Sequence, residues 1–252
     1  MQDMLIYTRF LRSSHQRGFT LTELAIVLFI VALLIGGMMV PLSVQIDQRN
    51  ISDTNKTLAE IREALIGYAA SHQATTTGKP YLPCPTTDNS GTEDRSPAGD
   101  CKKNEGWLPW VTLGVGQTDA WNNRFRYSVK FPFAYSGDGF KLDTTITIPP
   151  VPSLKVCDSN GCANTIADSL PVVILSHGKN GAGATTSSGL KLPDPAVGTE
   201  PDEFENIVFG ATTFVSRTPS PAGSPGGEFD DIVTWLPTSI LFSRMIAAGR
   251  LP

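Results

Sequence analysis

The residues with the clearest chemical potential stand in a short segment that precedes the longest apolar run of the chain. The segment reads Arg17-Gly18-Phe19-Thr20-Leu21-Thr22-Glu23. An ordinary secretory signal is cut after its apolar region, behind small residues of the A-x-A type. No such sequence follows this run, and the unusual features stand before it: a basic leader, the pair Gly18-Phe19 and one acid, Glu23.

Glu23 stands directly before the apolar run, where a carboxylate is costly if that run enters a membrane. Insertion scales put the cost of a charged residue in a membrane helix at about 2–3 kcal/mol, so such a group usually has a partner. The alternative is a glutamate whose carboxylate reaches the aqueous interface by itself.

Residues that could support catalysis are sparse in the rest of the chain. The histidines are His15, His72 and His177. His177 follows Ser176, but no G-x-S-x-G sequence surrounds the pair. The glycines of 178–183 lack the G-x-x-x-x-G-K-[ST] order of a phosphate-binding loop. The adjacent acids Asp230 and Asp231 could serve acid–base chemistry, although neighbours on a strand face opposite sides. The sequence therefore predicts no enzyme.

The apolar run must position the processing segment, and it has the length of a membrane helix. Leu24–Val40 contains only apolar residues and glycine, and no charge occurs over Leu24–Ile46. A helix over Leu24–Leu42 spans roughly 28 Å, about one hydrocarbon core. We therefore predict a transmembrane helix over 19–42. A buried core helix is the alternative, but such a helix usually carries a polar face.

Charges before the apolar run predict its orientation. Arg9, Arg12 and Arg17 precede the run, and only Asp3 opposes them. The excess of positive charge places the N-terminus in the cytoplasm and the residues beyond about 45 outside it.

Beyond the apolar run, the pattern indicates an α+β fold. Residues 43–74 continue the helix, because Leu58, Ile61, Leu65 and Ala69 recur at helical spacing. Residues 75–252 form a globular head, for which alternating or β-branched runs predict the strands Arg124–Val129, Thr144–Ile148, Val172–Leu175, Ile207–Val215 and Ile232–Leu236. A short C-terminal helix follows at Thr238–Ala248. The expected fold is a long N-terminal helix, membrane-embedded in its first half, that leads into an antiparallel-sheet head.

Composition narrows the classes of function. Charged residues make up 17% of the chain, and its net charge is −4. These values argue against a general nucleic-acid binder, and 40% hydrophobic residues argue against a highly charged disordered chain.

All cysteines fall in the predicted head, on the exported side where disulfides form. They are Cys84, Cys101, Cys157 and Cys162. Three pairings are possible. We favour Cys84–Cys101 and Cys157–Cys162, because each pair brackets a turn-rich loop. A zinc site of four cysteines is the alternative, which these spacings suit poorly.

The segment from Gly18 to about Val40 resembles the start of type IV pilins and pseudopilins, whose prepilins share the sequence G-F-T-L-x-E-L. In that superfamily a membrane peptidase cuts after the glycine and methylates the new amino-terminal phenylalanine. The resemblance implies that residues 1–18 are a leader that is removed, and that Phe19 becomes N-methylphenylalanine. It also implies that Glu23 meets the amine of a neighbouring subunit in a filament.

The same resemblance implies partners and a location. The partners are the prepilin peptidase, other pilin or pseudopilin subunits, and an inner-membrane assembly platform. The location is the bacterial inner membrane, crossed once, with the N-terminus cytoplasmic and the head in the periplasm, within a periplasm-spanning or surface filament.

Three segments of the head are similar to loops of major pseudopilins. Asp119–Tyr127 resembles D-P-W-G-x-x-Y with Asn122 in place of the glycine, and Ile174–Gly181 resembles S-x-G-x-D-G with Asn180 in place of the acid. Gly226–Trp235 resembles G-G-x-x-D-I-x-x-W. Some 42 residues, 184–225, stand between the last two.

In major pseudopilins the last of these regions binds calcium, which takes about six to eight oxygen ligands. No cofactor is required by the sequence, but Asp230 or Asp231 is a calcium candidate through this resemblance. The alternative is that one acid caps a turn and the other faces water. A separate group of acids is expected on a solvated loop: Glu200, Asp202, Glu203 and Glu205.

Two classes of function remain. The first is a filament subunit, with a minor pseudopilin of a type II secretion system favoured by the pseudopilin-like loops and the long, inserted head. A minor type IV pilin of a surface pilus is the alternative within this class. The second class is a membrane-anchored periplasmic enzyme or binding module that carries the same leader.

Overall fold

The computed structural model describes residues 18–142 and 153–251, and within the first helix it does not describe the side chains of residues 37–42. The chain divides into two units, one ending at Ile46 and one beginning at Asp47. Leader residues 1–17 and the predicted strand Thr144–Ile148 lie outside the described residues.

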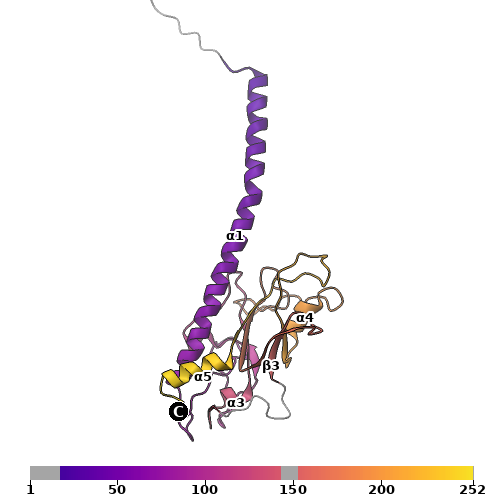
Figure 1. The fold of residues 1–252 in the computed structure, drawn as a ribbon. Coiled ribbons are helices and arrows are strands. Elements are labelled where there is room, and N and C mark those ends of the chain that lie inside the picture. Colours follow the sequence, from indigo (N-terminus) through magenta and orange to yellow (C-terminus); the bar gives the residue numbers. More distant parts are fainter. Residues whose placement is uncertain (1–17, 143–152, 252) are drawn as a thin grey trace, which may run out of the picture. The chain divides into compact units, whose positions relative to one another are not determined.

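The order of the elements is that of an α+β fold, as the sequence predicts. The elements are α1 (Leu21–Ser71), β1 (Glu105–Trp107), α2 (Trp110–Leu113), β2 (Arg126–Val129), α3 (Phe131–Ala134), β3 (Leu154–Cys157), β4 (Thr165–Leu170), β5 (Val172–Ser176), α4 (Pro201–Ile207), β6 (Thr213–Val215), β7 (Ile232–Leu236) and α5 (Thr238–Ala247) (Figure 1). The predicted long helix, strands at 172–175 and 232–236 and C-terminal helix are confirmed.

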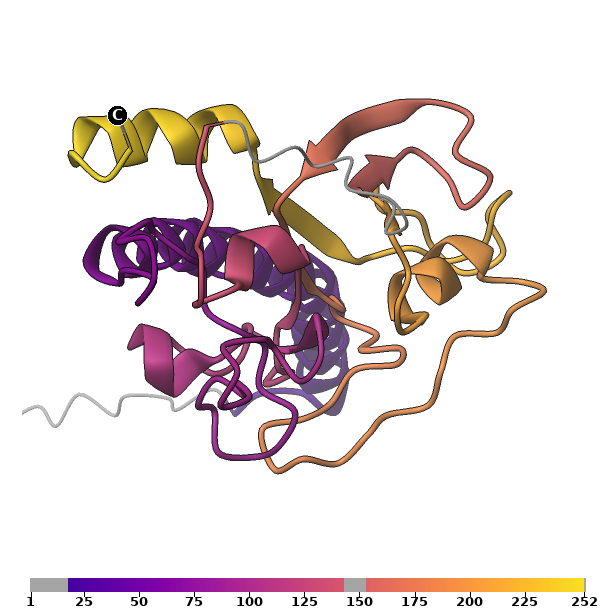
Figure 2. The same cartoon turned by 90° about the horizontal axis from the view of Figure 1, so that it is seen from below.

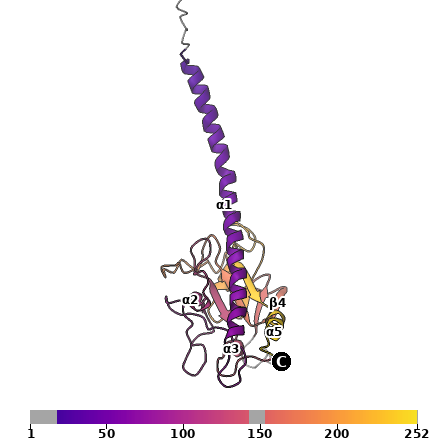
Figure 3. The same cartoon turned by 90° about the vertical axis from the view of Figure 1, so that its left-hand side faces the viewer.

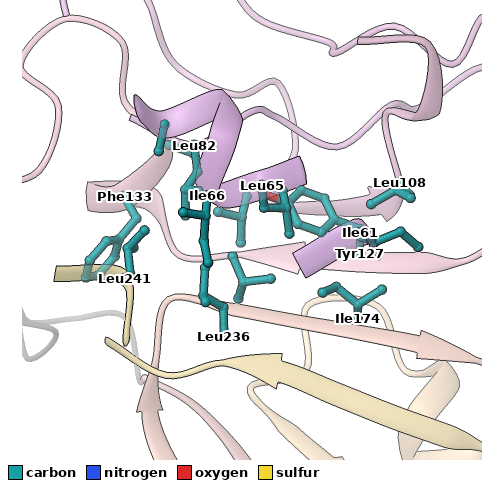
Figure 4. Close-up of a cluster of buried hydrophobic side chains, with 14 of the residues drawn as sticks. Ile61, Leu65, Ile66, Leu82, Leu108, Tyr127, Phe133, Ile174, Leu236 and Leu241 are labelled. Atoms are coloured by element: carbon teal, nitrogen blue, oxygen red, sulfur yellow. The ribbon is translucent and has the colours of Figure 1, made fainter. Parts of the chain in front are cut away.

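The part of α1 beyond Asp47 supplies one wall of the head core. Its buried apolar residues lie three or four positions apart, so they form one stripe: Leu58, Ile61, Leu65 and Ala69. Figure 4 shows Ile61 and Leu65 directed toward Tyr127 and Ile174 of the sheet. Helix α5 adds Leu241 to the same cluster. The helical spacing in the sequence therefore predicted the core face correctly.

The four-stranded sheet has the order β1-β2-β5-β7, with antiparallel pairing throughout. All five residues of β5 are buried, because the strand has a layer on each face. Val172 and Ile174 join the cluster with α1, whereas Val173 and Leu175 join a second cluster. Figure 3 shows these strands behind the lower turns of α1.

The second cluster is closed by a three-stranded sheet of order β4-β3-β6. Figure 2 shows β3 and β4 on the side of β7 away from α1. The antiparallel sheet that the sequence predicts is confirmed, and the β3–β6 pair is an exception because it is parallel. A parallel pair needs a long crossover connection, and β4, β5 and α4 supply it here.

One predicted strand, Ile207–Val215, is wrong over its first half. Ile207 ends α4, and only Thr213–Val215 forms a strand. The buried Arg126 guanidinium donates hydrogen bonds to the carbonyls of Asn206 and Val208, so that one of the groups a strand would use is occupied. Gly210 has φ +79°, in the left-handed region that a strand does not use.

Both disulfides join the pairs that the sequence favours, Cys84–Cys101 and Cys157–Cys162. Their Cα–Cα distances are 5.2 Å and 5.0 Å. The first pair closes a loop with a sequence separation of 17 residues. A loop of about 15 residues contributes about 3 kcal/mol in the chain-entropy account of cross-linking.

The stripe on α1 makes a quantitative prediction about stability. Leu65→Ala removes a fully buried side chain and should destabilise the head by about 2–5 kcal/mol, because a cavity replaces the lost contacts. The matched control is Leu190→Ala, since that side chain is 64% exposed, and its effect should stay within about 0.5 kcal/mol. Urea denaturation followed by tryptophan fluorescence measures both. Equal effects of the two substitutions would contradict the assignment of the stripe to the core.

Candidate processing segment and metal site

The predicted cleavage point lies in non-helical chain directly before α1. Gly18, Phe19 and Thr20 precede the first helical residue, and the Phe19 side chain is 85% exposed. A Cβ added to Gly18 would meet no atom within 4 Å. The Gly18–Phe19 peptide bond is therefore open to an approaching enzyme within the described part of this unit.

Thr20 and Glu23 form a reciprocal cap on the first turn of α1. The Thr20 amide and hydroxyl each donate to Glu23 Oε2, both at 2.8 Å. The Glu23 amide donates to Thr20 Oγ1 at 3.2 Å. This arrangement satisfies amides that a helix start leaves free, and its signature is Ser or Thr followed three residues later by Glu or Gln. The sequence T-L-T-E carries that signature, so this cap was predictable from the sequence although it was not predicted above.

The apolar side chains after Glu23 are exposed in the single chain. Leu24, Leu28 and Phe29 are 55%, 61% and 65% exposed. Exposed apolar surface of this extent indicates contact with lipid or with other chains. Among the described residues, no helix meets the combined length and hydropathy expected of a membrane crossing. The side chains of residues 37–42, the last of the predicted transmembrane segment 19–42, are not described. The helix itself is observed from Leu21, and its place in a membrane stays a prediction.

A second candidate site is a cluster of three carboxylates in the head. Glu203 comes from α4, and Asp230 and Asp231 come directly before β7. One oxygen of each lies within 4.8 Å of the others, a spacing that could hold a metal ion. Both calcium candidates of the sequence analysis are thus brought together.

Polar groups of the loop after β5 hold this carboxylate cluster. The Asn180 side-chain amide donates to both oxygens of Glu203 at 3.1 Å, and the Asn180 backbone amide donates to Asp230 Oδ2 at 2.8 Å. The Asp230 amide donates to Glu203 Oε1 at 2.9 Å. Asp230 Oδ1 is buried and accepts no hydrogen bond among the described residues.

Asp231 connects the cluster to His177. Asn206 Nδ2 donates to Asp231 Oδ2 at 2.7 Å, and His177 Nδ1 lies 3.6 Å from Asp231 Oδ1. His177 is 4% exposed, and its Nδ1 has no hydrogen-bond partner within the described chain. Two buried polar atoms at one site, Asp230 Oδ1 and His177 Nδ1, therefore make no hydrogen bond within the described part of the chain.

Burial and mutual repulsion raise the pKa values of the clustered acids. Burial raises the pKa of Glu203 to about 8, and the charge of Asp231 adds to the shift. Burial is also the first cause that raises the pKa of Asp230 to about 6. The ionised forms of these carboxyl groups are therefore unfavourable unless a cation neutralises their charge.

Two expectations about these acids are wrong. Glu203 and Asp202 were expected on a solvated loop, but they are 1% and 5% exposed. Glu203 was missed as a site residue, and its only local sign is Pro201, which starts a helix in the midst of the acids. Asp230 and Asp231 do not lie on opposite faces, because both precede the strand.

The three pseudopilin-like segments meet at this place. Ser176 Oγ donates to Asp119 Oδ2 at 2.6 Å, which joins the first segment to the second. Asn180 joins the second to the third through Asp230. Gly178 has φ +57°, and an added Cβ would lie 2.3 Å from the Asp230 carbonyl oxygen, so only glycine fits. Asn122 has φ +68°, which asparagine tolerates better than most residues.

The raised pKa values predict how stability depends on pH when divalent cations are absent. The folded pKa of Glu203 exceeds its unfolded value of 4.5, so its protonated form stabilises the fold at low pH. This contribution is lost as the pH rises toward about 8. Glu203→Gln keeps a neutral side chain at every pH, so the loss of stability between about pH 5 and about pH 8 should shrink.

Urea denaturation in a chelator at the two pH values measures this difference. Glu60→Gln on the exposed face of α1 is the control and should keep the wild-type dependence. A Glu203→Gln variant with an unchanged dependence would show that this carboxyl does not titrate as described.

Comparison with known proteins bears on the first site only. No curated protein and no solved structure matches the chain. A family model, the prokaryotic N-terminal methylation motif, matches residues 13–39. That motif implies processing by a prepilin peptidase, anchoring in the inner membrane through the N-terminal segment, and assembly with other pilins, in a class that is generally structural. Over residues 13–39 this chain therefore carries the prepilin-type cleavage and methylation segment of the type IV pilin and pseudopilin superfamily.

Proposed function

We propose that the protein is a minor pseudopilin of a type II secretion system, which assembles through its N-terminal helix and takes part in protein transport. The observation that carries the proposal is the meeting of three pseudopilin-like segments at one place, through the Asp119–Ser176 and Asn180–Asp230 hydrogen bonds. The three segments lie far apart in the sequence, yet each resembles a loop of major pseudopilins and they interact with one another. Their meeting supports a common origin of this part of the head with the heads of pseudopilins.

The role as a minor subunit rests on the size of the head. Residues 184–225 stand between the second and third pseudopilin-like segments, and they contribute α4 and β6. A large head limits how densely identical subunits can pack along a filament. A minor type IV pilin of a surface pilus shares the leader chemistry and is the alternative that the experiment below separates.

Glu23 has two tasks in this proposal. In the single chain it accepts the hydrogen bonds of Thr20 through Oε2. In the filament its charge would meet the new amine of Phe19 on a neighbouring subunit, and an inner-membrane assembly platform would bring the subunits together. A carboxylate in an apolar surrounding is stabilised by such a charged partner.

We propose calcium as a ligand of the carboxylate cluster. Glu203, Asp230 and Asp231 offer oxygen ligands of the kind that calcium prefers. Support comes from Asp230 Oδ1, which is buried and has no hydrogen-bond partner in the described parts of the chain, and from the raised pKa values of Glu203 and Asp230. A cation at this position would offset the burial and the repulsion that raise those pKa values.

The role of Glu23 can be separated from its cap, because glutamine keeps the capping hydrogen bonds and removes the charge. In a host strain that lacks the native gene, wild-type protein should restore secretion, whereas Glu23→Ala and Glu23→Gln should both fail although the leader is still removed. Secreted proteins, surface pili and leader removal are measured together.

Each outcome of this experiment has a distinct meaning. Full function of Glu23→Gln would show that the cap, and not the charge, is what the filament needs. Normal secretion without the gene, accompanied by a loss of surface pili, would contradict the assignment to a secretion system and favour the pilus.

Calcium binding is measured by titration calorimetry on the processed full chain in a non-ionic detergent. Calcium should bind and raise the melting temperature of the wild type, and Glu203→Gln should weaken binding by about ten-fold or more. Glu60→Gln, on the exposed face of α1, should bind as the wild type does. Absence of calcium binding to the wild type would contradict the calcium proposal and would leave the proposed filament role unaffected.

A further inference from the structure

A cavity of about 300 Å³ lies beside the carboxylate cluster, and His177 contacts both. The charged side chains that line the cavity are positive, whereas those of the cluster are negative. The positively charged residues that line it are Arg124, Arg126 and Lys191. The described residues around the cavity include no acid, and Trp107, Ile207 and Phe209 give it apolar walls. This volume is at the small end of the range for ligand sites, which is about 300–1,000 Å³.

Two of the three cations are neutralised by neighbouring acids. Arg126 pairs with Glu105, with Arg126 Nε donating to Glu105 Oε1 at 2.6 Å. Lys191 Nζ lies 2.7 Å from Asp194 Oδ1 at an exposed position. These pairs leave Arg124 as the source of net charge at the cavity.

Arg124 is 2% exposed and has neutral partners among the described residues. Its Nη1 donates to Asn89 Oδ1 at 2.7 Å, and its Nη2 donates to the Ser187 carbonyl at 2.9 Å. Its Nε finds no acceptor among the residues that the structure describes. Burial lowers the pKa of Arg124, and no carboxylate offsets this effect. A buried guanidinium without a counter-charge is unfavourable, so an incoming anion would be stabilised there.

Two indole rings hold the Arg124 guanidinium in place. Its Cζ lies 5.1 Å from the ring centroids of both Trp107 and Trp110. Both rings pack against the guanidinium, whose N–H donors point outward along its edge. A planar carboxylate matches the edge of a guanidinium through paired hydrogen bonds.

We propose that this cavity binds a carboxylate that carries a compact apolar group, with the charge near Arg124 and the apolar group against Trp107 and Phe209. One unneutralised cation suits a singly charged group better than a doubly charged phosphate. The 67% exposure of Phe209 leaves apolar surface at the cavity for a ligand to cover. Either a small carboxylic acid or the C-terminus of a peptide has this chemistry.

The test uses calorimetry on the full processed chain in a non-ionic detergent. One arm titrates cyclohexanecarboxylate against its neutral amide, and the other titrates a tripeptide ending in phenylalanine against the same peptide with an amidated C-terminus. We expect at least one acid to bind about ten-fold more tightly than its amide, and the better acid identifies the source. Chloride at high concentration should weaken that binding.

Variants connect the binding to Arg124. Arg124→Gln should weaken acid binding by about ten-fold or more, whereas Arg124→Lys should retain part of it because the charge remains. Arg49→Gln is the matched control, since its side chain is 83% exposed on α1, and it should leave binding unchanged. Lys191→Ala, at an exposed position on the cavity, should weaken binding less and keeps the test informative if Arg124→Gln does not fold.

The proposal fails if neither acid binds, if acids and amides bind equally, or if folded Arg124→Gln binds as the wild type does. None of these outcomes bears on leader processing, on Glu23 or on calcium, because the probes lack a metal and the variants leave the N-terminal segment intact.

Discussion

The head depends on one apolar face of α1. Leu58, Ile61, Leu65 and Ala69 bury almost all of their surface against the four-stranded sheet and α5. Along this face, α1, the four-stranded sheet and α5 share one core. Strand β5 connects this core to the second one, because its two faces contribute side chains to both. Before Asp47, the described side chains of the same helix include many exposed apolar residues, among them Leu24, Leu28 and Phe29. One helix thus combines a segment that packs within its own chain and a segment whose apolar side chains stay exposed in the single chain.

Buried charged residues interact at the β1–β2 edge of the four-stranded sheet. Arg126 and Glu105 neutralise each other, and the carbonyls of Asn206 and Val208 complete the hydrogen bonds of the guanidinium. Charge is not neutralised in this way at two other places. Among the described residues, the carboxylate cluster has no cation bound to it by an ion pair other than His177, and Arg124 has no acidic partner. Regions of unbalanced negative and positive charge lie close together, with His177 at both. Such imbalances are expensive within a fold, and they suggest that ions or ligands complete it.

The local sequence pattern was sufficient to predict the strands that pair regularly within a sheet. Val172–Leu175 and Ile232–Leu236 were predicted within a residue, since β-branched residues in short runs are typical of paired strands. Ile207–Val215 is also rich in β-branched and aromatic residues, but Gly210 has a left-handed φ, and the Val208 carbonyl accepts a hydrogen bond from Arg126, some 80 residues earlier. No local pattern reports a partner at that distance.

The sites show the same division between local and distant information. The Gly18-Phe19 pair and Glu23 could be found because their signature is contiguous, and the T-L-T-E cap was equally visible. Glu203 could not, because its burial follows from Asn180 and Asp230, which approach from two other loops. An acidic run in a sequence looks solvated until those partners are known.

The central claim is that this chain is processed as a prepilin, and mass spectrometry of the mature protein from its native host tests it most directly. The account predicts an N-terminal peptide that begins at Phe19 and carries one added methyl group on its amine. A mature chain that retains residues 1–18, that begins at another residue, or that begins at an unmethylated Phe19 would contradict it.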